Sequence, residues 1–163
     1  MPAQPNLTFP RVGQHWPEQG GRFMGICPGQ NGQADYCLIA SNDPRTRFTD
    51  VKWGNRGQEV AGATSDWDGA TNTLAMNAAG SKLANDILTL EIDGFAGFYL
   101  PARHELRMIK LVAPDLIEED WHWSSTQYSA HTAWVQGFTD GYQYNYDKSN
   151  EFAARAVRRF LII

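Results

Sequence analysis

The chain has 163 residues, a formal net charge of −4 at pH 7, and aromatic residues at 12% of the sequence. This length fits one domain with its own hydrophobic core, and the composition excludes a disordered chain. The acidic balance argues against a general nucleic-acid binder, and no stretch approaches the roughly 18 apolar residues that membrane insertion requires.

Residues 1–13 contain three prolines without hydrophobic periodicity, which predicts an extended arm ahead of a single domain over residues 14–163. The arm has no domain of its own that could bury Leu7 and Phe9, so we expect it to dock on a neighbouring subunit. A flexible terminus is the alternative. The arm lacks the charged start and apolar run of a signal peptide.

Residues 21–41 predict two strands around a Gly/Asn turn, and residues 47–54 predict a third, short strand. Cys27 and Cys37 flank the turn. A disulfide between opposed strands and two small buried thiols are both consistent with this spacing. No histidine lies near them in the sequence, so they do not indicate a zinc site.

Residues 64–80 predict a helix that Thr64 or Ser65 caps, with Asp66 and Asp68 in its first turn. The apolar face of this helix is expected to comprise Trp67, Ala70, Leu74 and Ala78.

Residues 83–94 fit either a helix or a strand. A second helix is predicted to open just after Pro101 and to end near Pro114, and its buried side comprises Leu106, Ile109 and Val112.

The sequence after Pro114 alternates in short runs separated by Gly, Ser and Asn, which predicts short strands and an α+β domain. Residues 133–146 predict a hairpin around Asp140–Gly141, and residues 153–160 predict a final strand that pairs with the early hairpin. In the predicted hairpin, Trp134 and Phe138 share one face while Ala133 and Val135 share the other. The sequence leaves open which face is buried.

Catalytic motifs are missing from the sequence. The "HEL" at His104 is not HExxH, and there is no GxSxG and no glycine-rich phosphate loop. Each histidine could act as a base, but none has a nucleophile and an orienting carboxylate at motif spacing. We therefore expect structural or surface roles for the four histidines, His15, His104, His122 and His131.

Carboxylates suggest two alternatives. A glycan hydrolase would need a pair in a cleft, and the sequence offers Asp140 with Asp147, or Glu118 with Asp120. Calcium could take oxygens from Asp140, Asn145, Asp147 and Asn150, although turn formation explains the same residues and their spacing matches no EF-hand. We expect no catalytic residue, no metal and no cofactor.

Residues 97–160 combine "LPARHEL", "WSST", "AWVQGF", "KSN" and "RAVRRF". Together these motifs resemble a family of bacterial and phage domains with the C-type lectin fold. That family is similar to the variable proteins of diversity-generating retroelements and, more distantly, to formylglycine-generating enzymes. The segment "WPEQGGRFMGICPGQNGQADYCLIAS" also resembles the front part of phage and prophage members.

The resemblance implies a C-type lectin-like fold with two helices, a small sheet that joins the termini, and a second set of short strands carrying the binding face. The segment "SKLANDILTLEIDG" departs from this pattern because it is longer and more apolar than expected.

The resemblance also assigns residues to roles. Its binding face falls on Gln127, Tyr128, His131, Trp134, Gln136, Tyr142, Gln143, Tyr144, Asn145 and Tyr146. Its scaffold falls on Leu100, Pro101, Glu105, Trp123, Ser124, Ser125, Arg155 and Arg158. The two arginines are expected to pair with carboxylates such as Glu105.

The stretch "YQYNY" places Tyr142, Tyr144 and Tyr146 on one side of a strand. That side is either core or a recognition surface. Three buried hydroxyls would each need a partner, whereas exposed tyrosines beside Gln and Asn are typical of binding surfaces. We expect at least two of the three to reach solvent or a partner, with Gln143 or Asn145.

The resemblance implies a non-enzymatic binding module of a phage particle, such as a tail-tip, fibre or decoration protein on the virion. It would be made in the bacterial cytoplasm and would contact a bacterial surface protein or glycan, or another virion protein through the arm, as a homo-oligomer. Alternatives are a bacterial surface or secreted lectin-like domain, and a glycan-processing or formylglycine-type enzyme. Formylglycine-generating members depend on late cysteines, and the late region has none.

Overall fold

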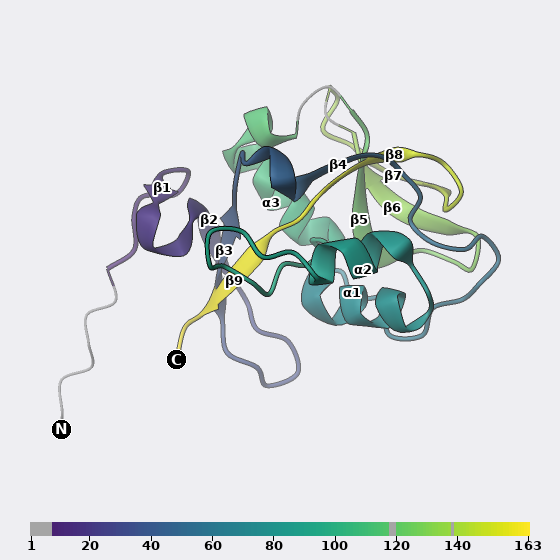
Figure 1. Ribbon diagram of the computed structural model, residues 1–163, viewed down its shortest axis with the longest axis horizontal. Coiled ribbons are helices and arrows are strands. Elements are labelled where there is room, and N and C mark those ends of the chain that lie inside the picture. The colour runs from purple at the N-terminus through teal and green to yellow at the C-terminus, as the bar shows by residue number, and fades with distance from the viewer. Residues whose placement is uncertain (1–7, 118–119, 138) are drawn as a thin grey trace.

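The computed structural model describes residues 8–117, 120–137 and 139–163. Within these ranges the chain forms two β-sheets and three α-helices, so the predicted α+β class is confirmed. Figure 1 shows the two sheets side by side, with the start of the described chain and its end both beside the first sheet. None of the helices in these ranges has the length and apolar character to cross a membrane.

The first sheet is antiparallel and has the order β1-β2-β3-β9. Its strands are β1 (His15–Trp16), β2 (Gly21–Cys27), β3 (Tyr36–Ala40) and β9 (Arg158–Leu161). The early hairpin therefore pairs with the last strand, as predicted.

The second sheet has the order β4-β8-β5-β6-β7. Its strands are β4 (Arg47–Val51), β8 (Phe152–Arg155), β5 (His122–Gln127), β6 (Thr132–Gln136) and β7 (Gln143–Asp147). The short strand and the late hairpin are confirmed. The single final strand over residues 153–160 is wrong, because the chain crosses from one sheet to the other between β8 and β9, where Val157 bridges to Tyr99.

Helix α1 (Gly69–Ala78) begins later than predicted. Its N-cap is Asp68, whose carboxylate accepts from the Thr71 amide at 3.1 Å, rather than Thr64 or Ser65. The predicted apolar face is also wrong, because Leu74 is 60% exposed. The residues that this helix buries are Gly69, Asn72, Thr73 and Met76.

Polar side chains can occupy that buried face because the backbone satisfies them. The Asn72 amide donates to the Ser65 carbonyl at 2.7 Å, and the Thr73 hydroxyl donates to the Gly69 carbonyl at 2.7 Å.

The ambiguous segment forms a third helix, α2 (Lys82–Leu88), which Ser81 caps. The expectation of two helices is therefore wrong. Helix α3 (Arg103–Val112) starts and ends where predicted and buries Leu106 and Ile109. Three short 3₁₀ turns open on prolines: Pro17–Gln19, Pro44–Thr46 and Pro114–Leu116.

The helices divide the core. Helices α1 and α2 pack on the second sheet around Trp123, while α3 packs on one face of the first sheet around Leu38. Cys27 lies on that α3 side and Cys37 on the opposite face. Both cysteines are buried and free, so they are buried thiols rather than a disulfide, and burial raises the pKa of Cys27 to about 12.

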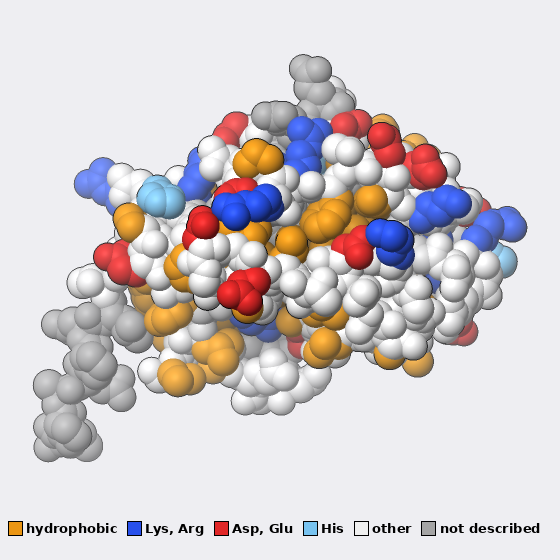
Figure 2. Space-filling model, in the orientation of Figure 1, with side chains coloured by type: hydrophobic (Ala, Val, Ile, Leu, Met, Phe, Trp, Pro, Cys, Tyr) orange, Lys and Arg blue, Asp and Glu red, His pale blue; other side chains and the backbone are white. Residues whose placement is uncertain are grey.

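The outer face of the first sheet receives the end of the arm. The Phe9 ring lies 5.8 Å from that of Phe23 and 5.9 Å from that of Trp16. Phe9 therefore packs on its own chain, while docking of the arm on a neighbouring subunit stays a prediction. Leu7 lies outside the described residues. Figure 2 shows hydrophobic side chains gathered beside the lower end of this sheet and again near the middle of the view, with charges of both signs interspersed.

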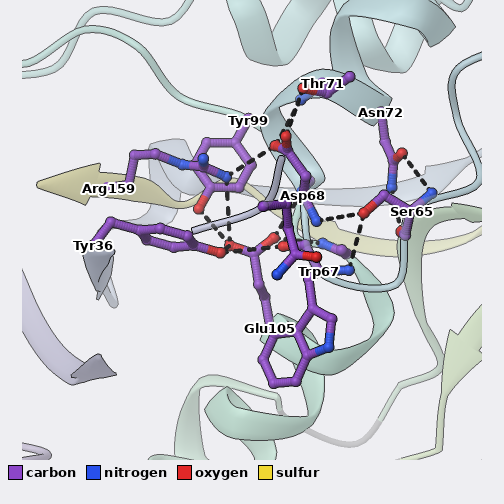
Figure 3. A network of polar contacts seen from close by, with 12 residues as sticks. Tyr36, Ser65, Trp67, Asp68, Thr71, Asn72, Tyr99, Glu105 and Arg159 are labelled. Atoms are coloured by element: carbon purple, nitrogen blue, oxygen red, sulfur yellow. Dashed lines mark hydrogen bonds and ion pairs between the residues drawn. The ribbon is translucent and has the colours of Figure 1, made fainter. Parts of the chain in front are cut away.

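A buried polar network joins the first sheet to the starts of α1 and α3 (Figure 3). One oxygen of Glu105 accepts from the backbone amides of Gly69 (2.9 Å) and Ala102 (3.0 Å). The other accepts from the hydroxyls of Tyr36 (2.8 Å) and Tyr99 (2.6 Å). Burial raises the pKa of Glu105 from its ordinary value.

The arginine beside this carboxylate is not one of the two predicted. Arg159 lies 3.8 Å from Glu105 and 3.3 Å from Asp68. Arg155 donates to the carbonyls of Leu116 and Ser41, and Arg158 donates to those of Ala96 and Gln19. Because adjacent strand residues point to opposite faces, only Arg159 on β9 points toward the α3 side.

The other predicted scaffold residues are buried: Leu100, Pro101, Trp123, Ser124 and Ser125.

Candidate functional site: two faces of the β6–β7 hairpin

The register of β6 with β7 separates the predicted binding residues onto two faces. Val135 pairs with Tyr144, and Trp134 pairs with Asn145. Opposed residues of antiparallel strands share a face, so the tyrosines lie on the side of Val135. We call the side with Val135 the tyrosine face; it comprises Tyr142, Tyr144, Tyr146 and Trp121. We call the opposite side the tryptophan face; it comprises Tyr128, Trp134, Gln143, Asn145 and Arg103.

The tyrosine face is solvent-exposed. Tyr142 is 66% exposed, and Tyr144 and Tyr146 are each 37% exposed. This confirms that at least two tyrosines reach solvent, and the core alternative is wrong. Val135 and Ala133, which lie beside Tyr144 and Tyr146 on the same face of the sheet, are fully buried, so Ala133 and Val135 mark the buried face of β6. Phe138 lies outside the described residues.

Ring contacts order the tyrosines into a row. The centroid of Tyr144 lies 6.4 Å from that of Tyr142 and 6.4 Å from that of Tyr146. The Trp121 ring supports two of them, at 5.3 Å from both Tyr144 and Tyr146. Rings held in this way have little rotamer freedom left to lose when a ligand binds.

Asp140 fixes one end of this row. Its carboxylate accepts from the Tyr142 amide at 3.0 Å and from the Tyr144 hydroxyl at 2.8 Å. These bonds lower the pKa of Asp140 and raise that of Tyr144. A Cβ at position 137 would lie 2.7 Å from the Asp140 oxygen, so a larger residue there would displace the carboxylate that holds Tyr142 and Tyr144.

The tryptophan face is anchored to α3. The Arg103 guanidinium lies 3.8 Å from the centroid of the Trp134 ring, and Tyr128 meets the same ring edge-on at 5.4 Å. The Gln143 carbonyl oxygen accepts from Arg103 and Arg107, both at 3.2 Å. Sequence reasoning missed both arginines, although their spacing of four on a predicted helix places them on one face.

Two predicted binding residues are buried and serve the scaffold. The Gln136 side chain donates to the carbonyls of Gly137 (2.8 Å) and Gly141 (3.0 Å), which closes the hairpin turn. Gln127 is 5% exposed and binds Val60 and Lys148. Their assignment to a binding surface is therefore wrong, because both side-chain amides are buried and already hydrogen-bonded to groups of the scaffold.

The histidines do not gather. His15 and His131 are exposed, and His104 packs on Trp67 with ring centroids 4.8 Å apart. His122 is buried, and burial lowers its pKa to about 4.

The candidate carboxylates form turns. Asp140 and Asp147 flank opposite ends of β7, and Asp147 accepts from Arg56 and Ser149. Glu118 lies outside the described residues. Within those residues, no group of three or more His, Cys, Asp or Glu side chains is placed to hold a metal.

Lys148 follows β7 directly, and its buried ammonium group predicts that the stability of the fold depends on pH. Its ammonium donates to the carbonyl of Gln58 (2.8 Å) and to Gln127 (2.7 Å), and burial lowers its pKa from 10.5 to about 8. Between these values the unfolded chain keeps a proton that the folded chain has lost. Stability arising from this group is therefore expected to rise as the pH increases from about 8 to about 10.5.

Urea unfolding of the native chain and of Lys148→Met at pH 8 and pH 10.5 measures this effect. Between pH 8 and pH 10.5 the unfolding free energy of the native chain is expected to rise relative to that of Lys148→Met. The rise is expected to reach up to roughly 3 kcal/mol, at about 1.4 kcal/mol per pKa unit. Tyrosine ionisation affects both proteins and cancels in the difference. A difference that stays constant or moves the other way contradicts the assignment.

The comparisons add no relative. No protein-family model matches the chain, and no curated protein matches it.

Proposed function

We propose that this chain is a non-enzymatic binding module of a phage particle, with a C-type lectin-like fold, and that the tyrosine face is its contact surface for a bacterial surface receptor. The observation that carries the proposal is the ordered, exposed row of Tyr142, Tyr144 and Tyr146. The motif resemblance over residues 97–160 supports the fold and the virion context.

The geometry suits recognition because the rings are exposed yet already positioned. Trp121 packs under two of them, and Asp140 holds the Tyr144 hydroxyl. Phenol rings offer a large contact area and a hydroxyl that hydrogen-bonds, with few rotors to freeze. The tryptophan face is more constrained, because Arg103 already covers one side of Trp134.

Tyr142→Ala tests the proposal. Because this side chain is 66% exposed, the change is expected to alter the unfolding free energy by no more than about 0.5 kcal/mol. Loss of an exposed aromatic contact is expected to weaken receptor binding by at least 1 kcal/mol, or about fivefold. Flow cytometry of the labelled chain on a panel of intact bacterial strains measures retention.

Leu74→Ala is the matched control, since Leu74 is 60% exposed on α1, away from the hairpin. It is expected to retain binding. If both Tyr142→Ala and the double variant with Tyr142 and Tyr144 replaced by Ala still bind the bacterial strains, the receptor surface lies elsewhere.

A further inference from the structure

Strand β7 is an open edge of the second sheet: within the described ranges it pairs with β6 and with no other strand. The backbone pattern shows which of its groups remain available. The Gly137 amide donates to the Tyr142 carbonyl at 2.8 Å, and the Lys148 amide donates to the His131 carbonyl at 2.9 Å. Even-numbered residues of β7 therefore bond to β6, and Gln143, Asn145 and Asp147 direct their backbone groups outward.

The other sheet edges carry features that discourage pairing. β1 has only two residues, and β4 has a shifted register around Asp50, whose φ is 53°. β9 carries Arg158 and Arg159. Natural sheets block their edges with short strands, bulges, charges or proline. β7 has no Lys, Arg, Pro or register shift, and its charged residue Asp147 stands at its end.

We propose that β7 pairs antiparallel with β7 of a second copy of this chain, about a twofold axis at Asn145. This register opposes Gln143 to Asp147 of the second copy and Asn145 to its own equivalent. The outward backbone groups of Gln143, Asn145 and Asp147 in one copy then face those of the same three residues in the other copy, and no like charges are opposed. The Asp147 carbonyl already accepts from the Asn150 amide at 3.0 Å and has a second lone pair for the new bond.

The same register brings Tyr144 opposite Tyr146 of the second copy, so the two tyrosine faces join into one surface. Because opposed residues share a face, the rings of both copies point to the same side. The inference does not rest on receptor binding, since dimerisation is measured with the purified chain alone.

Sedimentation velocity from micromolar to millimolar concentration tests the proposal. The native chain is expected to convert from monomer to dimer. Asn145→Pro removes an outward N–H and no hydrogen bond to β6, a position at which edge strands accept proline, and it is expected to remain monomeric. Asn145→Ala keeps that N–H and is expected to dimerise. Circular dichroism and thermal unfolding of each variant verify the monomer fold.

Asn145→Lys decides the question if the proline variant does not fold, because it opposes two lysines at the twofold axis and is expected to remain monomeric. An equimolar mixture of Asn145→Lys with Asn145→Asp is expected to form the heterodimer, which native mass spectrometry detects. A native chain that stays monomeric overturns the proposal. So does a dimer that Asn145→Lys leaves unchanged, or a monomeric Asn145→Ala.

Discussion

Replacing Glu105 with glutamine is expected to lower the free energy of unfolding by about 3–5 kcal/mol, the usual effect of breaking a fully buried charged network. The carboxylate accepts four hydrogen bonds, two from backbone amides and two from tyrosine hydroxyls. Glutamine has nearly the same shape, but its NH₂ would face two of these donors. It would also leave the partly buried Arg159 without the nearby negative charge of Glu105.

Thermal unfolding measures this effect. For a domain of this size 1 kcal/mol corresponds to about 2–4 °C, so the melting temperature is expected to fall by roughly 10 °C. Glu91→Gln is the matched control, since Glu91 is exposed, and it is expected to stay within about 0.5 kcal/mol of the native chain. A Glu105→Gln variant as stable as that control would mean that the network does not hold α1 and α3 to the first sheet.

Local patterns predicted the elements whose signals lie within a few residues. Pro101 and Pro114 delimited α3, and the alternation in "YQYNY" placed three tyrosines on one face. The partner of Glu105 was not predictable in this way. Arg155, Arg158 and Arg159 are near neighbours in sequence, and the crossing between the sheets, a long-range feature, decides which one faces the carboxylate.

The start of α1 shows a second limit. The sequence predicted Thr64 or Ser65 as the cap, although Asp66 and Asp68 are equally good capping residues. Asp68 is the cap in the fold, while the Ser65 hydroxyl accepts from the Asp68 amide at 2.8 Å. The helix also buries the face opposite to the predicted one: Leu74 lies in solvent and Asn72 in the core, where a backbone carbonyl satisfies its amide.

Gln127→Ala is expected to lower the free energy of unfolding by about 3 kcal/mol or more, although the motif resemblance assigned this residue to the binding face. Its carbonyl oxygen accepts from the Val60 amide at 2.8 Å and from the Lys148 ammonium at 2.7 Å. Truncation leaves a buried amide without its acceptor and a buried cation with one acceptor fewer, and unmet groups of this kind cost about 1–3 kcal/mol each, more when charged.

Urea unfolding measures the loss, with the exposed Gln33→Ala as the matched control within about 0.5 kcal/mol of the native chain. Gln127→Glu is a sharper comparison. It keeps an acceptor for Lys148 and for the Val60 amide, but it replaces the donor to the Val60 carbonyl at 3.3 Å with a second oxygen that faces that carbonyl. We expect its stability to lie between those of the native chain and the alanine variant. If Gln127→Ala instead unfolds like the native chain and loses retention on bacterial cells, Gln127 belongs to the receptor surface and the assignment of its amide to the scaffold fails.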